Sequence, residues 1–153
     1  MFLTVHSAIG LTAVTALGIH NPAAAFAVGL VLHYLGDAVP HGDEPIGEWV
    51  KNGRSPVLRA APVFAGDFLL MSAMFALVSA TGGLQWHLVV AIAGSILPDV
   101  LFGIETIFKR RLFGFLSDLH DRAHAAIGIR LPLHYGLPFQ AVLAFMLWYG
   151  FPA

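Results

Sequence analysis

Residues 23–39 read AAAFAVGLVLHYLGDAV, an apolar run into which an imidazole and a carboxylate enter only near its end, at His33 and Asp37. The run contains no lysine or arginine, and its length approaches the roughly 20 residues that a helix needs to cross the hydrocarbon core of a bilayer. Because polar side chains inside a membrane are expensive, they usually have a function. The segment therefore predicts a transmembrane helix that carries part of a functional site.

The whole chain shares this apolar composition. Of its 153 residues, 58% are apolar and 11% are charged, and the mean hydropathy is +0.77. These values exclude an ordinary soluble domain. A net charge of -1 provides no basic surface for nucleic acid, so we expect no nucleic-acid partner. The lack of cysteine excludes disulfides, cysteine zinc sites and iron–sulfur clusters.

Apolar stretches of nearly bilayer-crossing length occur five times along the chain. They are Met1–Ile19, Ala23–Val39, Pro62–Ala80, Leu84–Phe108 and Leu131–Gly150. Two short breaks and two long ones, residues 40–61 and 109–130, separate them. We therefore predict an all-α membrane protein with about five transmembrane helices, folded as a single helical domain over residues 1–153 and surrounded by membrane lipids.

The cations predict how this protein lies in the membrane. All eight lie in the two long breaks: Lys51, Arg54, Arg59, Lys109, Arg110, Arg111, Arg122 and Arg130. Five spans place both long breaks on one side, and the positive-inside rule makes that side the cytoplasm. We expect an integral protein of the bacterial inner membrane with a cytoplasmic N-terminus and an external C-terminus.

One part of the second long break has its own helical pattern. Within residues 112–127, apolar residues recur at helical spacing at Leu112, Phe115, Leu116 and Leu119. This pattern predicts an amphipathic helix that lies along the cytoplasmic interface.

Polar side chains of the predicted spans and of this interfacial helix gather toward the cytoplasmic side. Six histidines and three carboxylates share this layer: His6, His33, His41, His120, His124, His134, Asp37, Asp67 and Asp99. His20 and His87 flank the short external breaks and belong to the opposite side. Because neutral imidazole and carboxylate ligands suit divalent metals, we expect a metal site, with zinc first and manganese or iron as alternatives.

The spacing of these residues suggests individual roles. His33 and Asp37 are four residues apart, as are His120 and His124, so each pair shares one face of a helix. Asp67 and His120 are the candidates for a proton acceptor in catalysis. Asp67 could instead interact with a helix dipole, and His120 and His124 could belong to a solvated face. The remaining acids have simpler interpretations: Asp43, Glu44 and Glu48 as loop residues, and Glu105 as an ion-pair partner of Lys109.

Four of these elements together resemble a known family, the small membrane-bound metal-dependent hydrolases. The elements are TVHSAIG at 4–10, HYLGDAVPHGD at 33–43, ILPD at 96–99 and the pair His120 and His124. The resemblance implies metal ligands among His6, His33, Asp37, His41, Asp99 and His124. Some members are compared with zinc-dependent phospholipase C, which implies phosphoester hydrolysis. The chain departs from the family pattern at Ala125, where a hydroxyl residue is expected.

Three functions are therefore open on the sequence. The first is hydrolysis of a phosphoester or another lipid-associated bond by a metal-activated water at the cytoplasmic face. The second is a metal or proton-coupled transporter, since buried acids and histidines also mark ion pathways. The third is an accessory subunit of a larger membrane complex or a homo-oligomer, with His33 or His134 as a ligand to a haem or chlorin pigment.

Overall fold

The computed structural model describes residues 1–82 and 85–149, and within them the chain forms seven helices and no strand. The helices are α1 (Leu3–Ala16), α2 (Pro22–Ala38), α3 (Glu44–Lys51), α4 (Pro56–Gly82), α5 (Trp86–Phe108), α6 (Phe115–Ala125) and α7 (Leu133–Tyr149). The predicted all-α class is confirmed. The predicted span ends at Leu84 and Gly150 lie outside the described residues.

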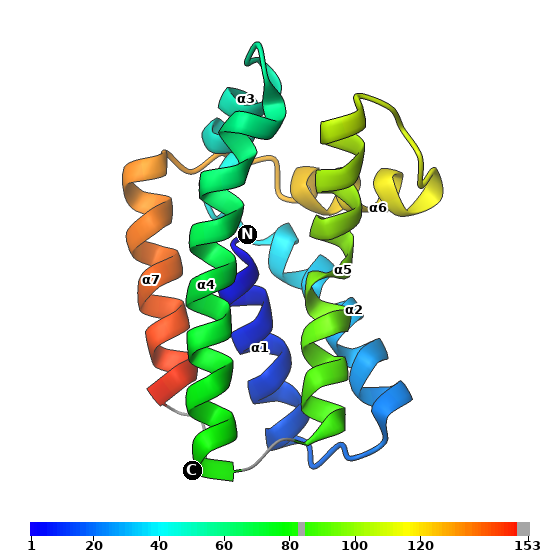
Figure 1. Ribbon diagram of the computed structural model, residues 1–153, viewed down its shortest axis with the longest axis vertical. Coiled ribbons are helices and arrows are strands. Elements are labelled where there is room, and N and C mark those ends of the chain that lie inside the picture. Colours follow the sequence, from blue (N-terminus) through cyan, green and yellow to red (C-terminus); the bar gives the residue numbers. More distant parts are fainter. Residues whose placement is uncertain (83–84, 150–153) are drawn as a thin grey trace.

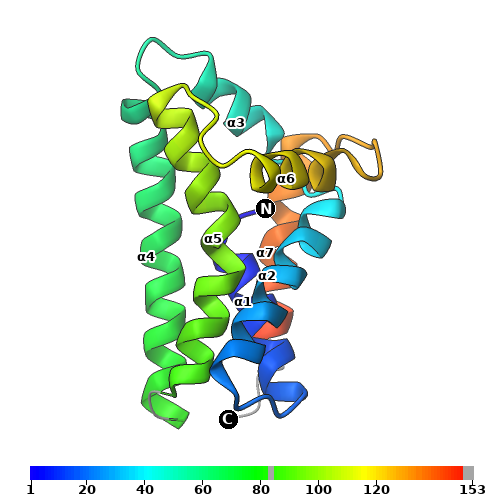
Figure 2. The same cartoon turned by 90° about the vertical axis from the view of Figure 1, so that its right-hand side faces the viewer.

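The apolar helices form an upright bundle in which consecutive members run in opposite directions (Figure 1). Helix α1 is the central member and contacts α2, α4, α5 and α7. Both long connections, with α3 and α6, lie at the same end of the bundle (Figure 2). The connection from α1 to α2 lies at the other end, where the rings of His20 and His87 meet at 5.0 Å.

Two of the five predicted spans are long enough to cross a membrane by length and composition. They are Pro56–Ala80 within α4, with 25 residues, and α5, with 23. The other apolar helices of the described chain are shorter: Leu3–Ala16, Pro22–Ala38 and Leu133–Leu147. The expected break at 40–61 is largely helical, because α3 lies within it and α4 begins at Pro56 rather than Pro62. Proline suits the first turn of both helices, where its missing N–H is not needed.

Glycines bring α1, α2 and α5 into close contact. A Cβ on Gly94 of α5 would lie 2.3 Å from the carbonyl oxygen of Phe26, and one on Gly29 of α2 would lie 2.3 Å from that of Ala91. A Cβ on Gly10 of α1 would lie 2.1 Å from the hydroxyl oxygen of Ser95. At Gly29 and Gly94 the close atoms belong to the backbone, so a larger residue would push α2 and α5 apart. This close approach brings the polar residues of the three helices together.

Large apolar side chains cover much of the outer surface of the bundle. On α4, Leu69 and Leu70 are 68% and 61% exposed, and on α7 Met146 is 65% exposed. By contrast, the fully buried side chains include several polar ones: His6, His33, Asp37, His41 and Gln140. Large apolar side chains are thus exposed on the outside of the bundle, while several polar side chains are buried beside an apolar core.

Candidate metal centre

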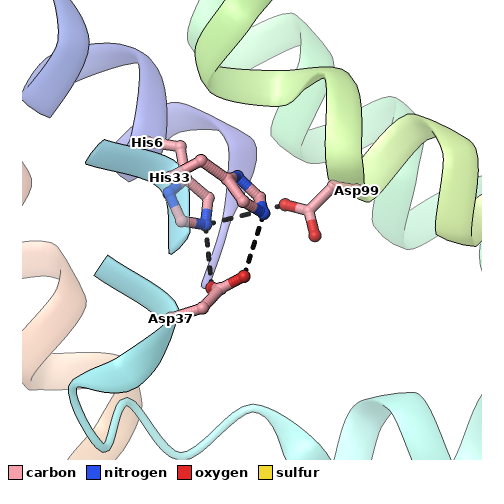
Figure 3. Close-up of side chains that lie close together, drawn as sticks. All are labelled: His6, His33, Asp37 and Asp99. Atoms are coloured by element: carbon pink, nitrogen blue, oxygen red, sulfur yellow. Dashed lines mark hydrogen bonds and ion pairs between the residues drawn. The ribbon is translucent and has the colours of Figure 1, made fainter. Parts of the chain in front are cut away.

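Asp37 is the centre of a buried cluster of imidazoles and carboxylates. Its side chain is shielded from solvent near the end of α2, with Oδ1 lying 3.0 Å from His6 Nε2 and Oδ2 lying 2.9 Å from His33 Nε2. The rings of His6 and His33 stack at 4.0 Å between centroids (Figure 3). Gly36 packs closely against this pair, since a Cβ there would lie 3.3 Å from the ring of His6.

Asp99 reaches the same cluster from α5. Its Oδ2 lies 3.7 Å from His6 Nε2, and its Oδ1 lies 3.2 Å from His120 Nε2 (the His6 contact is drawn in Figure 3). Asp99 follows Pro98, which cannot donate the backbone hydrogen bond that a helix would otherwise make to Gly94. Next to this interruption, the carbonyl oxygen of Ser95 lies 2.7 Å from His33 Nδ1.

The contact with Ser95 fixes the position of one proton on the His33 ring. A carbonyl oxygen can only accept a hydrogen bond, so His33 Nδ1 carries a proton and donates it to Ser95. In the neutral ring, Nε2 then presents a lone pair toward Asp37 Oδ2, another acceptor, and neither atom has a hydrogen-bond partner. At 2.9 Å this contact is favourable only when a cation, either a second proton on the ring or a metal ion, lies between the two atoms.

Helix α6 closes the cluster from the end of the bundle. His120 Nε2 lies 3.4 Å and His124 Nε2 lies 3.3 Å from Asp37 Oδ2. His120 is buried, whereas 26% of the His124 side chain is exposed. The apolar residue Phe115 is 74% exposed, whereas Leu116 lines a small pocket together with Pro98 and Phe102 of α5. The helix expected within residues 112–127 is present as Phe115–Ala125, with its histidines turned toward the protein.

Glu105 holds α6 in this place. Its carboxylate, near the end of α5, accepts hydrogen bonds from the backbone N–H groups of Leu112 and Phe113 and from the hydroxyl of Ser117. The expected ion pair of Glu105 with Lys109 is not found among the described residues. Lys109 instead ends α5 in a left-handed conformation.

A second part of the cluster follows α2. His41 Nδ1 donates to the carbonyl oxygen of Val39 at 2.7 Å, and His41 Nε2 lies 2.9 Å from Asp43 Oδ1. Gly42, with φ at +74°, turns the chain so that Asp43 lies beside His41. The Met1 ammonium lies 2.8 Å from His41 Nε2, 3.0 Å from Asp37 Oδ1 and 3.3 Å from Asp43 Oδ2.

The contact between His41 and Asp43 shifts the pKa of both groups. Burial alone lowers the pKa of His41, but the hydrogen bond to Asp43 brings it above its ordinary value. Burial alone raises the pKa of Asp43, but the contacts with His41 and the Met1 ammonium bring it below its ordinary value. Both shifts favour a charged pair. Asp43, expected to be a simple loop acid, is thus part of the cluster.

Two expected members of the layer lie elsewhere. Asp67 of α4 accepts hydrogen bonds from the backbone N–H groups of Leu3 and Thr4, at the start of α1. The carboxylate therefore interacts with a helix N-terminus, as the dipole interpretation suggested, although the helix is α1 rather than its own. Its catalytic role stays a prediction. His134 is exposed at the start of α7, with its ring 4.2 Å from that of Tyr135.

Helix α7 contributes Gln140 instead. This side chain is 2% exposed; it donates to the carbonyl oxygen of His41 and accepts from the N–H of Phe2. It therefore fixes the backbone at both His41 and the N-terminus. The signal in the sequence was a single amide within an otherwise apolar stretch, residues 137–147.

The cluster has the composition of a metal site. Ligand atoms within 4.8 Å of one another come from His6, His33, Asp37 and Asp99 in one group, and from Asp37, His41 and His124 in a second. The sequence proposed all six residues as ligands. Proton donation from Nδ1 of His33 and His41 to carbonyl groups is the arrangement that orients metal-binding histidines. A buried His/Asp cluster that could hold a divalent ion is therefore present.

Comparison with known proteins adds no relative. No protein-family profile matches the chain, and no curated protein or solved structure is significantly similar to it.

Proposed function

We propose that this protein is a five-span membrane hydrolase that holds a divalent metal, zinc first, near the cytoplasmic end of its bundle. The substrate is a phosphoester or another lipid-associated bond. The observation that carries the proposal is the convergence of ligand atoms of His6, His33, Asp37 and Asp99 within 4.8 Å of one another, in a largely buried place. A bound cation would be coordinated by these imidazole nitrogens and carboxylate oxygens.

The exposed apolar surface supports the membrane part of the proposal. Leu69 and Leu70 on α4 and Met146 on α7 present to the surroundings the side chains that lipid tails would cover. With a rise of about 1.5 Å per residue, α1 is only about 21 Å long, so its span requires local thinning of the bilayer. The end of the bundle with α3 and α6 carries both cation-rich connections and faces the cytoplasm in this proposal.

The position of the cluster supports the hydrolytic part. A divalent metal supplies Lewis acidity and lowers the pKa of a bound water. We assign the role of proton acceptor to His120, whose Nε2 faces the cluster 3.2 Å from Asp99 Oδ1 and 3.4 Å from Asp37 Oδ2. The partly exposed His124 marks the side from which substrate reaches the cluster. The exposed Phe115 of α6 supports contact of this side with the lipid surface.

The test is elemental analysis of purified protein with and without the central ligands. We expect metal in the wild type, and none in His33→Ala and Asp37→Ala. His134→Ala, a histidine variant at the same end of the bundle but outside the cluster, keeps the metal. Hydrolysis of a chromogenic phosphodiester in detergent micelles is then lost with the metal.

Two results would overturn the proposal. Wild-type protein that binds no zinc, manganese or iron under saturating conditions has no metal centre. Protein that binds metal and carries it across proteoliposome membranes, without hydrolysing any phosphoester, is a transporter.

A further inference from the structure

The six ligand residues do not form one group. Ligand atoms of His6, His33 and Asp99 converge with Asp37 in one group, and those of His41 and His124 converge with Asp37 in a second. Asp37 is the only residue in both groups of the described chain. A carboxylate has two oxygens and about four lone-pair directions, so one aspartate can serve two cations at once.

The contacts of Asp37 fit such a bridging position. Oδ1 faces His6 and the Met1 ammonium, each at 3.0 Å. Oδ2 faces His33 at 2.9 Å and His124 at 3.3 Å, and it has no hydrogen-bond partner although it is buried. Imidazole nitrogens that could bind a metal therefore approach both oxygens from several helices. No lysine or arginine of the described chain pairs with this carboxylate.

The second group is organised independently of the first. His41 is 1% exposed, and its Nδ1 donates to Val39, so the ring is oriented with Nε2 toward the cluster. The ring of His124 lies 5.0 Å from that of His41 and comes from α6 rather than from the α2 end. The Met1 ammonium lies between His41 Nε2 and Asp37 Oδ1, which shows that a positive charge is accommodated at this place.

We propose that Asp37 bridges two divalent metal ions, one held with His6, His33 and Asp99 and the other with His41 and His124. This inference rests on the proposed function, since it divides the same cluster into two sites. When bound, a pair of ions stabilises both the attacking and the leaving oxygen of a phosphoester, which favours that substrate class over a carboxylic ester. The second ion takes over the charge that the ammonium supplies in this structure.

The experiment counts ions per chain. Full-length protein in detergent is stripped with a chelator, titrated with Zn²⁺, and assayed for bound metal by mass spectrometry. We expect two equivalents in the wild type and one in His124→Ala or His41→Ala. In Asp37→Ala the affinity for both ions falls by more than about 100-fold, since even outer-shell partners are worth about 10- to 100-fold. His134→Ala, the matched control, still binds two.

A spectroscopic readout separates neighbouring ions from distant ones. With Mn²⁺ at two equivalents, the wild type gives the electron paramagnetic resonance signal of an exchange-coupled pair. His124→Ala gives the signal of an isolated ion. His124 is partly exposed on α6, and circular dichroism of the variant checks that its helix content is unchanged.

The outcomes distinguish this inference from the proposed function. One equivalent in the wild type, unaffected by His41→Ala and His124→Ala, overturns the two-ion site and leaves a single-metal hydrolase, with the Met1 ammonium as the permanent partner of Asp37. Two equivalents without magnetic coupling also overturn the bridge. No bound metal in the wild type overturns both proposals.

Discussion

Thr4 of α1 is joined to Asp67 of α4 by two hydrogen bonds to the same carboxylate oxygen. The backbone N–H of Thr4 donates to Oδ1 at 3.1 Å, and its hydroxyl donates to Oδ1 at 2.5 Å. The other oxygen accepts from the N–H of Leu3. Asp67 therefore acts as the N-terminal cap of a different helix, the one that carries His6.

Replacement of Asp67 by alanine removes this cap. We expect Asp67→Ala to lower the free energy of unfolding by about 1–3 kcal/mol, because up to three donors at the start of α1 lose their acceptor. Zinc content stays at the wild-type value. Thermal unfolding and elemental analysis on the same sample measure both. A variant with wild-type stability and metal content but no hydrolysis would instead establish Asp67 as the catalytic proton acceptor.

The close contact of α2 with α5 gives a second prediction. Gly94→Ala places a methyl group against the carbonyl of Phe26, so the two helices must separate. We expect a loss of about 1–3 kcal/mol in stability and weaker metal binding, because His33 on α2 is oriented by Ser95 on α5. Gly103→Ala, on the same helix but with no atom within 4 Å of its Cβ, is the control. Equal stabilities for the two variants would contradict the close packing.

The sequence predicted the helices well because apolar length and periodicity are local properties. It also predicted that His33 and Asp37 share a face, since four residues make about one helical turn. His33 and Asp37 lie close to His6 and Asp99 because consecutive helices run in opposite directions. This arrangement brings residues of different helices together at the same end of the bundle. These parts of the cluster therefore require no knowledge of side-chain packing.

The parts that the sequence did not predict depend on loops and on helix rotation. Asp43 joins His41 only because Gly42 adopts a positive φ. Asp67 lies at a depth similar to that of the cluster, but its side of α4 faces the start of α1. His134 lies at the right end of the bundle on an exposed position of α7, whereas Gln140 of the same helix is buried. Rotation about a helix axis is set by packing, which hydropathy alone does not specify.

The natural lack of cysteine allows a direct test of membrane topology. Asn52, between α3 and α4, and Gln85, just before α5, are both exposed and lie at opposite ends of the bundle. We expect a membrane-impermeant maleimide to label Gln85→Cys in intact bacteria and to label Asn52→Cys only after the inner membrane is opened. The reverse pattern would invert the proposed orientation. Labelling of both in intact cells would contradict a membrane between them.

The charged pair of His41 and Asp43 predicts how the stability of the metal-free protein depends on pH. The pKa of His41 is raised, so its contribution is complete below about pH 6.5 and is lost as the pH rises through the folded-state pKa. The pKa of Asp43 is lowered, so its contribution to stability is present above about pH 3.9 and is lost as the pH falls through the folded-state pKa.

Asp43→Asn should therefore destabilise chelator-treated protein most between about pH 4 and 6.5, by about 1–3 kcal/mol, and less at pH 9. Thermal unfolding across this range measures the difference, with Asp121→Asn as the control because Asp121 pairs with Arg111 on the exposed surface. A difference that is the same at every pH would show that no charged pair forms.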